Sequence, residues 1–323
     1  VGRNALALNT TGTQNTALGE FALDANTTSN NSTAIGFNNL SSSTGASNTG
    51  TGSYCLSSNT SGSQNVAMGH AAMQFNTSGG SNTALGEAAL YTNTTGGNNT
   101  AVGKNALNAN TASGNTAVGH QALQANTSGS GNIALGKNSL LSNTTGDQNV
   151  ALGQNSLDAN TTADNNTAIG HEALGANTTG TQNTAVGHSA LDANTTANYN
   201  TAIGAEALTS NTEGASNVAV GRNSLNSNTT ADKNTAVGAL SLYANTTGTQ
   251  NVAVGANALD ANTTGNYGVA VGYDALTANT TGTSNVAIGV NALATNTTGS
   301  NSTAIGYQAL QESSSGYNNT AVG

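Results

Sequence analysis

The sequence contains no proline, no tryptophan and a single cysteine among 323 residues, and only 6% of its residues are charged. Ordinary globular proteins carry roughly a quarter charged residues and about 45–50% apolar residues, whereas the apolar share here is 35%. This shortage of large apolar side chains argues against a compact globule with a thick core. Disorder is not favoured either, because disordered chains are typically rich in charge and proline.

The small number of basic residues and the lack of long apolar runs exclude two classes of partner. Only 5 residues are basic and the net charge is −9, so the clustered Lys and Arg that hold nucleic-acid phosphates are missing and no nucleic-acid partner is expected. No apolar run approaches the roughly 20 residues of a membrane-spanning helix, so direct membrane insertion is not expected. The chain opens within a motif, at VGRNAL, and closes on NTAVG, which suggests a fragment of a longer repeat array.

The sequence does contain one motif, repeated from end to end. With the Asn of NTAVG as position 1, the frame starts at residue 15 and recurs until residue 319; sixteen of the eighteen intervals are 17 residues and two are 16. The unit reads N-[TV]-A-[VIL]-G-x-x-[AS]-L-x-[AS]-N-T-T-G-x-x. Glycine occupies position 5 in every copy. A fixed period of this kind predicts a single solenoid domain over residues 1–323.

Alternation within the unit predicts how each coil is built. Positions 2 and 4 are β-branched or aliphatic and flank the Ala of position 3, which is the period of a strand. We expect positions 4 and 9 (Val186 and Leu191 in one copy) to face the core with position 2, and Ala185 of position 3 to face outward. Gly187 would end the strand where φ is positive or where no Cβ fits. Positions 8 to 11 are expected to form a second short strand, followed by an NTTG turn.

The predicted fold is therefore all-β: a parallel β-solenoid or β-roll with one 17-residue repeat per coil and about 19 coils. Asn side chains stacked at positions 1 and 12 are expected to hydrogen-bond along it. A single coil buries little apolar surface, so the free energy gained by burial falls short of the conformational entropy lost when the coil is ordered. An outward column of Ala suits the close approach of another chain. We therefore expect self-association, as a homotrimer or a filament.

The motif N-[TV]-A-[VIL]-G, as in NTAVGHSALDANTTANY, resembles the SVAIG-type repeats of YadA-like trimeric autotransporter adhesin heads. The chain is also similar to the NTAxGxxALxxNTTG arrays of bacterial surface proteins and phage tail-fibre-like proteins. The resemblance covers residues 1–323 and implies a left-handed parallel β-roll that packs as a trimer on a bacterial surface. The repeat here is longer than the adhesin repeat by its NTTG turn.

These observations predict an extracellular structural fibre or adhesin shaft that supplies length, stiffness and multivalent attachment to carbohydrate or a host surface. It would lie outside the cell, on the cell surface or in a virion fibre. The alternatives are an ice-binding β-solenoid with Thr arrays and a phage tail-fibre shaft. No enzyme is expected, because Ser, His and Asp vary from coil to coil and no triad is assembled in one place; no cofactor is expected either.

Four side chains are weak candidates for metal binding. His171 and His188 occupy position 6 of successive coils and should stack about 4.8 Å apart, close enough to share a metal. Asp147 and Asp164 stack in the same way at position 16 and are considered for calcium, which needs six to eight oxygen ligands. Exposed polar decoration is the simpler interpretation of all four.

Position 12 creates N-x-S/T sequons, which would accept glycans if the source glycosylates; they include Asn26, Asn160, Asn177, Asn194, Asn245, Asn262 and Asn279. The turn itself demands Asn and Thr, so the pattern needs no sugar. Cys55 stands where other copies place Ala or Ser and is expected to be a small buried thiol. The coils from 32 to 64 are the least regular, with Asn39, Gly50 and Thr51 outside the consensus, and are expected to hold a kink or a specialised patch.

Overall fold

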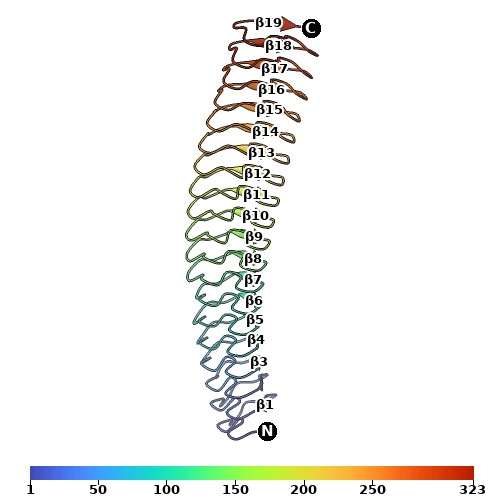
Figure 1. Cartoon of the computed structure of the whole chain (residues 1–323). Helices are drawn as coiled ribbons and strands as arrows, with labels where there is room; N and C mark the ends of the chain where they lie inside the picture. Colours follow the sequence, from blue (N-terminus) through green and yellow to red (C-terminus); the bar gives the residue numbers. More distant parts are fainter. The chain divides into compact units, whose positions relative to one another are not determined.

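The structure is a computed structural model that describes residues 1–323 and comprises two compact units, Val1–Asp164 and Asn165–Gly323. Its only regular elements are three-residue strands (Figure 1). The first unit contains β1 (Thr16–Leu18), β2 (Thr33–Ile35), β3 (Thr49–Thr51), β4 (Val66–Met68), β5 (Thr83–Leu85), β6 (Thr100–Val102), β7 (Thr116–Val118), β8 (Ile133–Leu135) and β9 (Val150–Leu152). The second contains β10 (Thr167–Ile169), β11 (Thr184–Val186), β12 (Thr201–Ile203), β13 (Val218–Val220), β14 (Thr235–Val237), β15 (Val252–Val254), β16 (Val269–Val271), β17 (Val286–Ile288), β18 (Thr303–Ile305) and β19 (Thr320–Val322).

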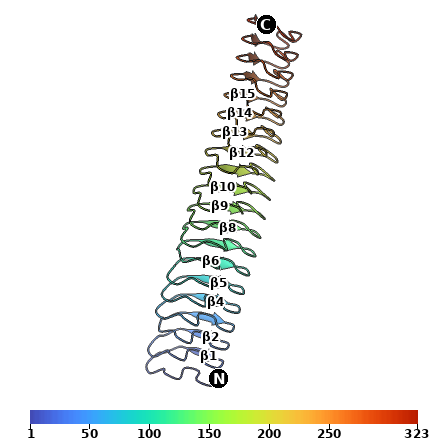
Figure 2. The ribbon, with the colours of Figure 1, turned by 60° about the vertical axis from the view of Figure 1, so that its left-hand side comes forward.

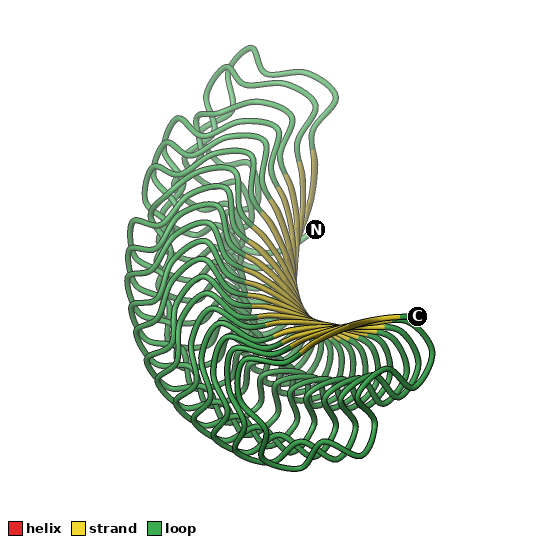
Figure 3. Ribbon diagram, turned by 90° about the horizontal axis from the view of Figure 1, so that it is seen from above, coloured by secondary structure: helices red, strands yellow, loops and turns green.

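Each unit is a parallel β-solenoid with one repeat per coil, which confirms the predicted fold class. Neighbouring strands pair in parallel and in register, so that Thr184 lies opposite Thr201 and Ala185 opposite Ala202. Within each unit the coils stack one above the other, with the strands on one side and turns closing the rest of the coil (Figures 2 and 3). The two 16-residue intervals keep this register, because their missing residue falls in the turn.

The core of each coil holds small side chains and one leucine. Ala185, Ala190 and Leu191, at positions 3, 8 and 9, have no exposed surface, and the Asn side chains of positions 1 and 12 are buried with them. The prediction for position 9 is thus confirmed, whereas the prediction for the strand is reversed: Ala185 points inward, and Val186 lies half-exposed on the outside. An Ala column that lines the core is not available as an interface between chains.

The reversal follows from how narrow the interior is. At the one strand where glycine replaces the inward alanine, a Cβ on Gly50 would lie 2.1 Å from Oδ1 of Asn39, the position-8 side chain of the preceding coil. Position 3 therefore faces position 8 across a gap that only small side chains can share. A Val or Ile on the inward side of the strand would not fit there, because close-packed interiors tolerate little extra volume.

The predicted second strand at positions 8 to 11 does not form. Positions 7 and 9 adopt left-handed backbone conformations instead, as in Ser189 (φ 48°) and Leu191 (φ 55°), and position 17 does the same. This conformation is unusual for leucine, and it turns the Leu side chain into the core from within a turn. The turn still pairs with its neighbours as a strand would: Leu191 N donates to the carbonyl oxygen of Ala207 in the following coil at 2.9 Å.

Both physical reasons offered for the position-5 glycine apply. Gly187 has φ +136°, and a Cβ there would lie 2.6 Å from the carbonyl carbon and oxygen of Gly204 in the next coil. The left-handed φ excludes most side chains, and the close contact excludes even a methyl group. Coils that stack only one strand spacing apart therefore require glycine at position 5.

Two buried Asn ladders run along the coils, as predicted. At position 12, Asn194 donates from Nδ2 to Oδ1 of Asn177 at 2.9 Å and to the carbonyl oxygen of Ala197 at 3.1 Å. At position 1, the backbone N–H of Asn200 donates to Oδ1 of Asn183 at 2.9 Å. Buried amides are normally hydrogen-bonded, and Asn183, Asn194 and Asn200 find these partners in their own and the neighbouring coils.

The position-1 ladder is interrupted at Gly268. Its own N–H donates to Oδ1 of Asn251 at 2.8 Å, but it offers no side-chain oxygen to the N–H of Asn285 in the next coil. We expect Gly268→Asn to raise the free energy of unfolding by about 1 kcal/mol, because it adds the missing acceptor and restricts the unfolded chain. Denaturant unfolding of the two proteins measures the difference; a less stable variant would contradict the ladder's role.

In the irregular coils, two departures from the consensus in the core compensate each other in volume. Asn39 replaces a small residue at position 8 and is fully buried, and its Nδ2 donates to the carbonyl oxygens of Gly52 at 2.8 Å and Ile35 at 3.3 Å. Its Oδ1 occupies the space that an alanine at residue 50 would need. The larger side chain at 39 and the smaller one at 50 therefore explain each other.

A double-mutant cycle tests this compensation. We expect Gly50→Ala alone to cost about 2 kcal/mol of stability through overpacking, and the same change in an Asn39→Ala background to cost nothing or to stabilise. The measurement is the coupling free energy from denaturant unfolding of the four proteins. Additive effects would show that residues 39 and 50 do not share the same space.

Candidate functional site

The described chain has no pocket and no helix of the length and apolarity needed to span a bilayer. Any site must therefore be built from side chains on the outer surface of the coils. Three groups stand out there: the outward side chains of the strands, a row of aromatic rings, and a cluster of two histidines with a glutamate.

The first group is the strand face, which we define as the outward side chains at positions 2 and 4 of the strands in each unit. In the second unit the four consecutive strands β15 to β18 present Val254, Val271, Ile288 and Ile305, each 36–39% exposed. No hydroxyl of a position-2 Thr on this face has a hydrogen-bond partner in the protein. Contiguous exposed apolar surface of this kind marks interaction sites in other proteins.

The second group is an aromatic row at positions 6 and 7 of the first unit. Phe21, Phe37, Tyr54 and His70 follow one another edge-to-face, with ring centroids 6.2, 5.3 and 6.1 Å apart, and the guanidinium of Arg3 lies 5.3 Å from the centre of the first ring. The row crosses the irregular coils, where the sequence indicated a specialised patch. The repeat alone does not show this row as one line, because its rings alternate between position 7 (Phe21 and Tyr54) and position 6 (Phe37 and His70).

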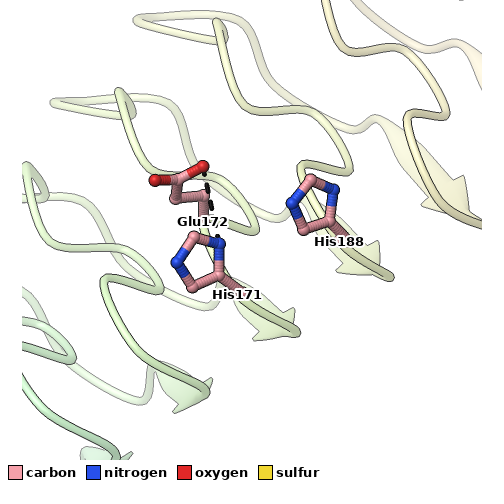
Figure 4. A group of neighbouring side chains, drawn as sticks. All are labelled: His171, Glu172 and His188. Atoms are coloured by element: carbon pink, nitrogen blue, oxygen red, sulfur yellow. Dashed lines mark ion pairs between the residues drawn. The ribbon is translucent and has the colours of Figure 1, made fainter.

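The third group is the histidine cluster: His171, Glu172 and His188, which follow β10 and β11 (Figure 4). The two imidazole rings are parallel to within 5°, with centroids 5.5 Å apart, so the predicted stacking is confirmed. Glu172 adds a carboxylate oxygen 3.5 Å from Nδ1 of His171. Its direction was not predictable from spacing alone, because it is set by the left-handed φ of 56° at position 7.

Asp192, at position 10 of the His188 coil, belongs to the same electrostatic environment. Burial raises the pKa of its carboxyl, and the negative charge of Glu172 raises that pKa further, while the two histidines lower it. Two carboxylates beside two imidazoles concentrate negative charge on this part of the surface, which attracts cations.

The predicted calcium candidates have a structural role instead. Oδ1 of Asp147 accepts hydrogen bonds from the backbone N–H of Ser130 at 2.6 Å and from its hydroxyl at 3.0 Å. Oδ1 of Asp164 accepts from the backbone N–H of Asp147 at 2.7 Å. These carboxylates cap the backbone of the preceding coil, and no third acidic group joins them.

The predicted glycan sites are wrong, because their side chains lie inside the coil. Asn26, Asn160, Asn177, Asn194, Asn245, Asn262 and Asn279 are at most 1% exposed. In Asn245, for example, Nδ2 donates to Asn228 and to Gly248, both at 2.9 Å. A sugar on this nitrogen would break both bonds and has no room, so the sequon is a by-product of the ladder.

Cys55 is a buried free thiol, as predicted. Its Sγ donates to the carbonyl oxygen of Gly69 at 2.7 Å and lies 3.3 Å from that of Thr51, which matches the contacts of Asn39 one coil earlier. Burial raises the pKa of the thiol, although the hydrogen bonds oppose this. The thiolate, which is the reactive form, is therefore disfavoured, and the residue fills space.

No family model and no curated protein sequence matches the chain. The fold itself defines the class: a parallel β-solenoid with a 17-residue repeat.

Proposed function

We propose that this chain is an extracellular structural fibre or adhesin shaft, on a cell surface or in a virion fibre such as a phage tail fibre, and that it associates with copies of itself through the strand face. The observation that carries the proposal is the row of exposed Val and Ile side chains on consecutive strands. A monomer would leave this row in water, whereas burial gains about 25 cal/mol per Å² of apolar surface.

The repeat supports the same function. Identical coils supply length without new chemistry, and they present one surface many times, which favours multivalent attachment. The likeness of the NTAVG motif to YadA-like adhesin heads favours a homotrimer. The strand face now takes the role in assembly that the Ala column was expected to have. The aromatic row supplies exposed rings for a carbohydrate or protein surface, since such rings combine a large apolar area with specific geometry.

Absolute mass from light scattering tests the proposal. The chain is 31.5 kDa, and we expect three times that mass in solution. Ile203→Glu combined with Val254→Glu places two charges on the strand face and should yield a single-chain mass. Thr196→Glu with Thr247→Glu adds the same charge on exposed turns and should leave the mass unchanged. A wild-type chain that stays monomeric at all concentrations would contradict self-association.

A second candidate, ice binding, is favoured by one observation. The sequence predicted that the position-2 Thr side chains face the core, but Thr184 and Thr201 are outward neighbours on paired strands. An ice-binding solenoid would remain monomeric and show thermal hysteresis that Thr184→Tyr with Thr201→Tyr abolishes. An oligomer without hysteresis supports the fibre and rejects this candidate.

A further inference from the structure

Two successive coils of the second unit bring three potential metal ligands together on the surface. His171 and His188 follow the position-5 glycines after β10 and β11, and the pairing of these strands in register sets their rings face to face. Glu172 turns its carboxylate to the same side (Figure 4). One ligand atom from each of the three lies within 4.8 Å of the others.

We propose that His171, Glu172 and His188 bind one divalent transition-metal ion of the zinc, copper or nickel class. Imidazole nitrogen suits these ions, and two histidines with one carboxylate form a ligand set used for zinc in proteins. The site is a property of these two coils and does not depend on the fibre proposal.

The distances permit coordination after a small movement. Metal–ligand bonds of about 2.0–2.2 Å place two ligand atoms of a tetrahedral ion about 3.4 Å apart, so the ligand atoms must approach by about 1.4 Å at most from their 4.8 Å limit. The side chains of His171 and Glu172 are 45% and 43% exposed. Exposed side chains change rotamer at little cost, and the backbone ladder fixes the spacing of the coils that carry them.

Charge around the site favours a cation. The carboxyl of Asp192 is close enough to interact with all three ligands, so an ion at this site would face two carboxyl groups, those of Glu172 and Asp192. Three protein ligands leave at least one coordination position open to water or to a group from another molecule. The ion would also join two consecutive coils and stabilise the folded state by mass action.

The chain contains a matched control in His120. It occupies the same position 6, but its neighbours at position 6 of the adjoining coils are Lys104 and Lys137, which repel cations. His120→Ala removes one surface imidazole at the same repeat position without touching the paired site, and it should leave zinc binding unchanged.

Isothermal titration of the untagged full-length chain with zinc chloride tests the proposal. We expect one zinc ion per chain, binding weakened more than about tenfold by His171→Ala or His188→Ala, since even outer-shell changes cost 10–100-fold, and no change in His120→Ala. Glu172→Gln should weaken binding less than loss of a histidine. Zinc should also raise the denaturation midpoint of the wild type but not of His188→Ala.

A spectroscopic measurement identifies the ligands independently of affinity. With one equivalent of copper(II), the electron paramagnetic resonance spectrum should show coupling to two imidazole nitrogens, reduced to one in His188→Ala. Circular dichroism of each variant verifies that the exposed replacements leave the fold intact. Zinc binding that persists in the His171→Ala/His188→Ala double variant, or that falls equally in His120→Ala, would overturn the proposal.

Discussion

Replacing Gly136 by alanine is expected to destabilise the first unit by about 4 kcal/mol. Gly136 has φ +139°, and its Cβ would lie 2.4 Å from the carbonyl oxygen of Gly153 and 2.6 Å from the carbonyl carbon. Both atoms belong to the backbone of the next coil, so relief requires the coils to separate. Backbone strain of this kind costs about 1–3 kcal/mol, and overpacking typically adds another 1–3 kcal/mol.

Gly131→Ala is the matched control, five residues earlier in the chain. Gly131 also has a left-handed φ, +67°, but a Cβ there would meet only Cγ of Gln148 at 3.6 Å. Other coils place Asn, Gln or Ser at this position with φ near 60°, so we expect a loss of about 1 kcal/mol. Denaturant unfolding followed by circular dichroism compares the two. Equal losses would mean that the contact with Gly153 does not limit how the coils stack.

The repeat made the fold predictable, because each coil obeys the same constraints nineteen times over. Invariant glycine at one position and Asn at two others indicated a tight backbone contact and stacked amides, and Gly187 and Asn194 show both. Such features depend only on the neighbouring coil. A prediction for one coil therefore extends to all of them without knowledge of the complete chain.

The two faces of the strand were not predictable in the same way. Alternation assigns Val186 and Ala185 to opposite faces, but it does not say which face is inside. Preference for burying the larger side chain gave the wrong answer, because the opposite wall is a turn in which Leu191 adopts a left-handed conformation. No local propensity predicts leucine there, and this leucine fills the interior that Val186 would have needed.

The candidate metal site was likewise predictable from the sequence only in part. The stacking of His171 on His188 follows from the 17-residue period, and their rings lie where that period places them. The contribution of Glu172 depends on the left-handed φ at position 7, which spacing does not show. Similarly, the sequons pointed to glycans because a sequence pattern cannot distinguish an exposed Asn from one that forms a buried ladder.

Asn245→Leu is expected to cost the second unit about 3 kcal/mol, although the two side chains have the same number and branching of non-hydrogen atoms. Nδ2 of Asn245 donates to Oδ1 of Asn228 and to the carbonyl oxygen of Gly248, both at 2.9 Å, and its Oδ1 accepts from Asn262 at 2.8 Å. Leucine removes three hydrogen bonds at once and leaves buried polar atoms without these partners. Each buried polar group left unsatisfied costs about 1–3 kcal/mol, and relaxation of the coil offsets part of that sum.

Thr247→Val is the control two residues away, because Thr247 is exposed on the turn and its hydroxyl makes no hydrogen bond within the protein. We expect its free energy of unfolding to stay within about 0.5 kcal/mol of the wild type, as is usual for surface substitutions. Amide hydrogen exchange locates the damage: loss of protection in Asn245→Leu should centre on the coils of β14 and β15 and extend along the ladder. A stable Asn245→Leu protein with unchanged exchange would show that apolar packing, and not the amide ladder, holds the coils together.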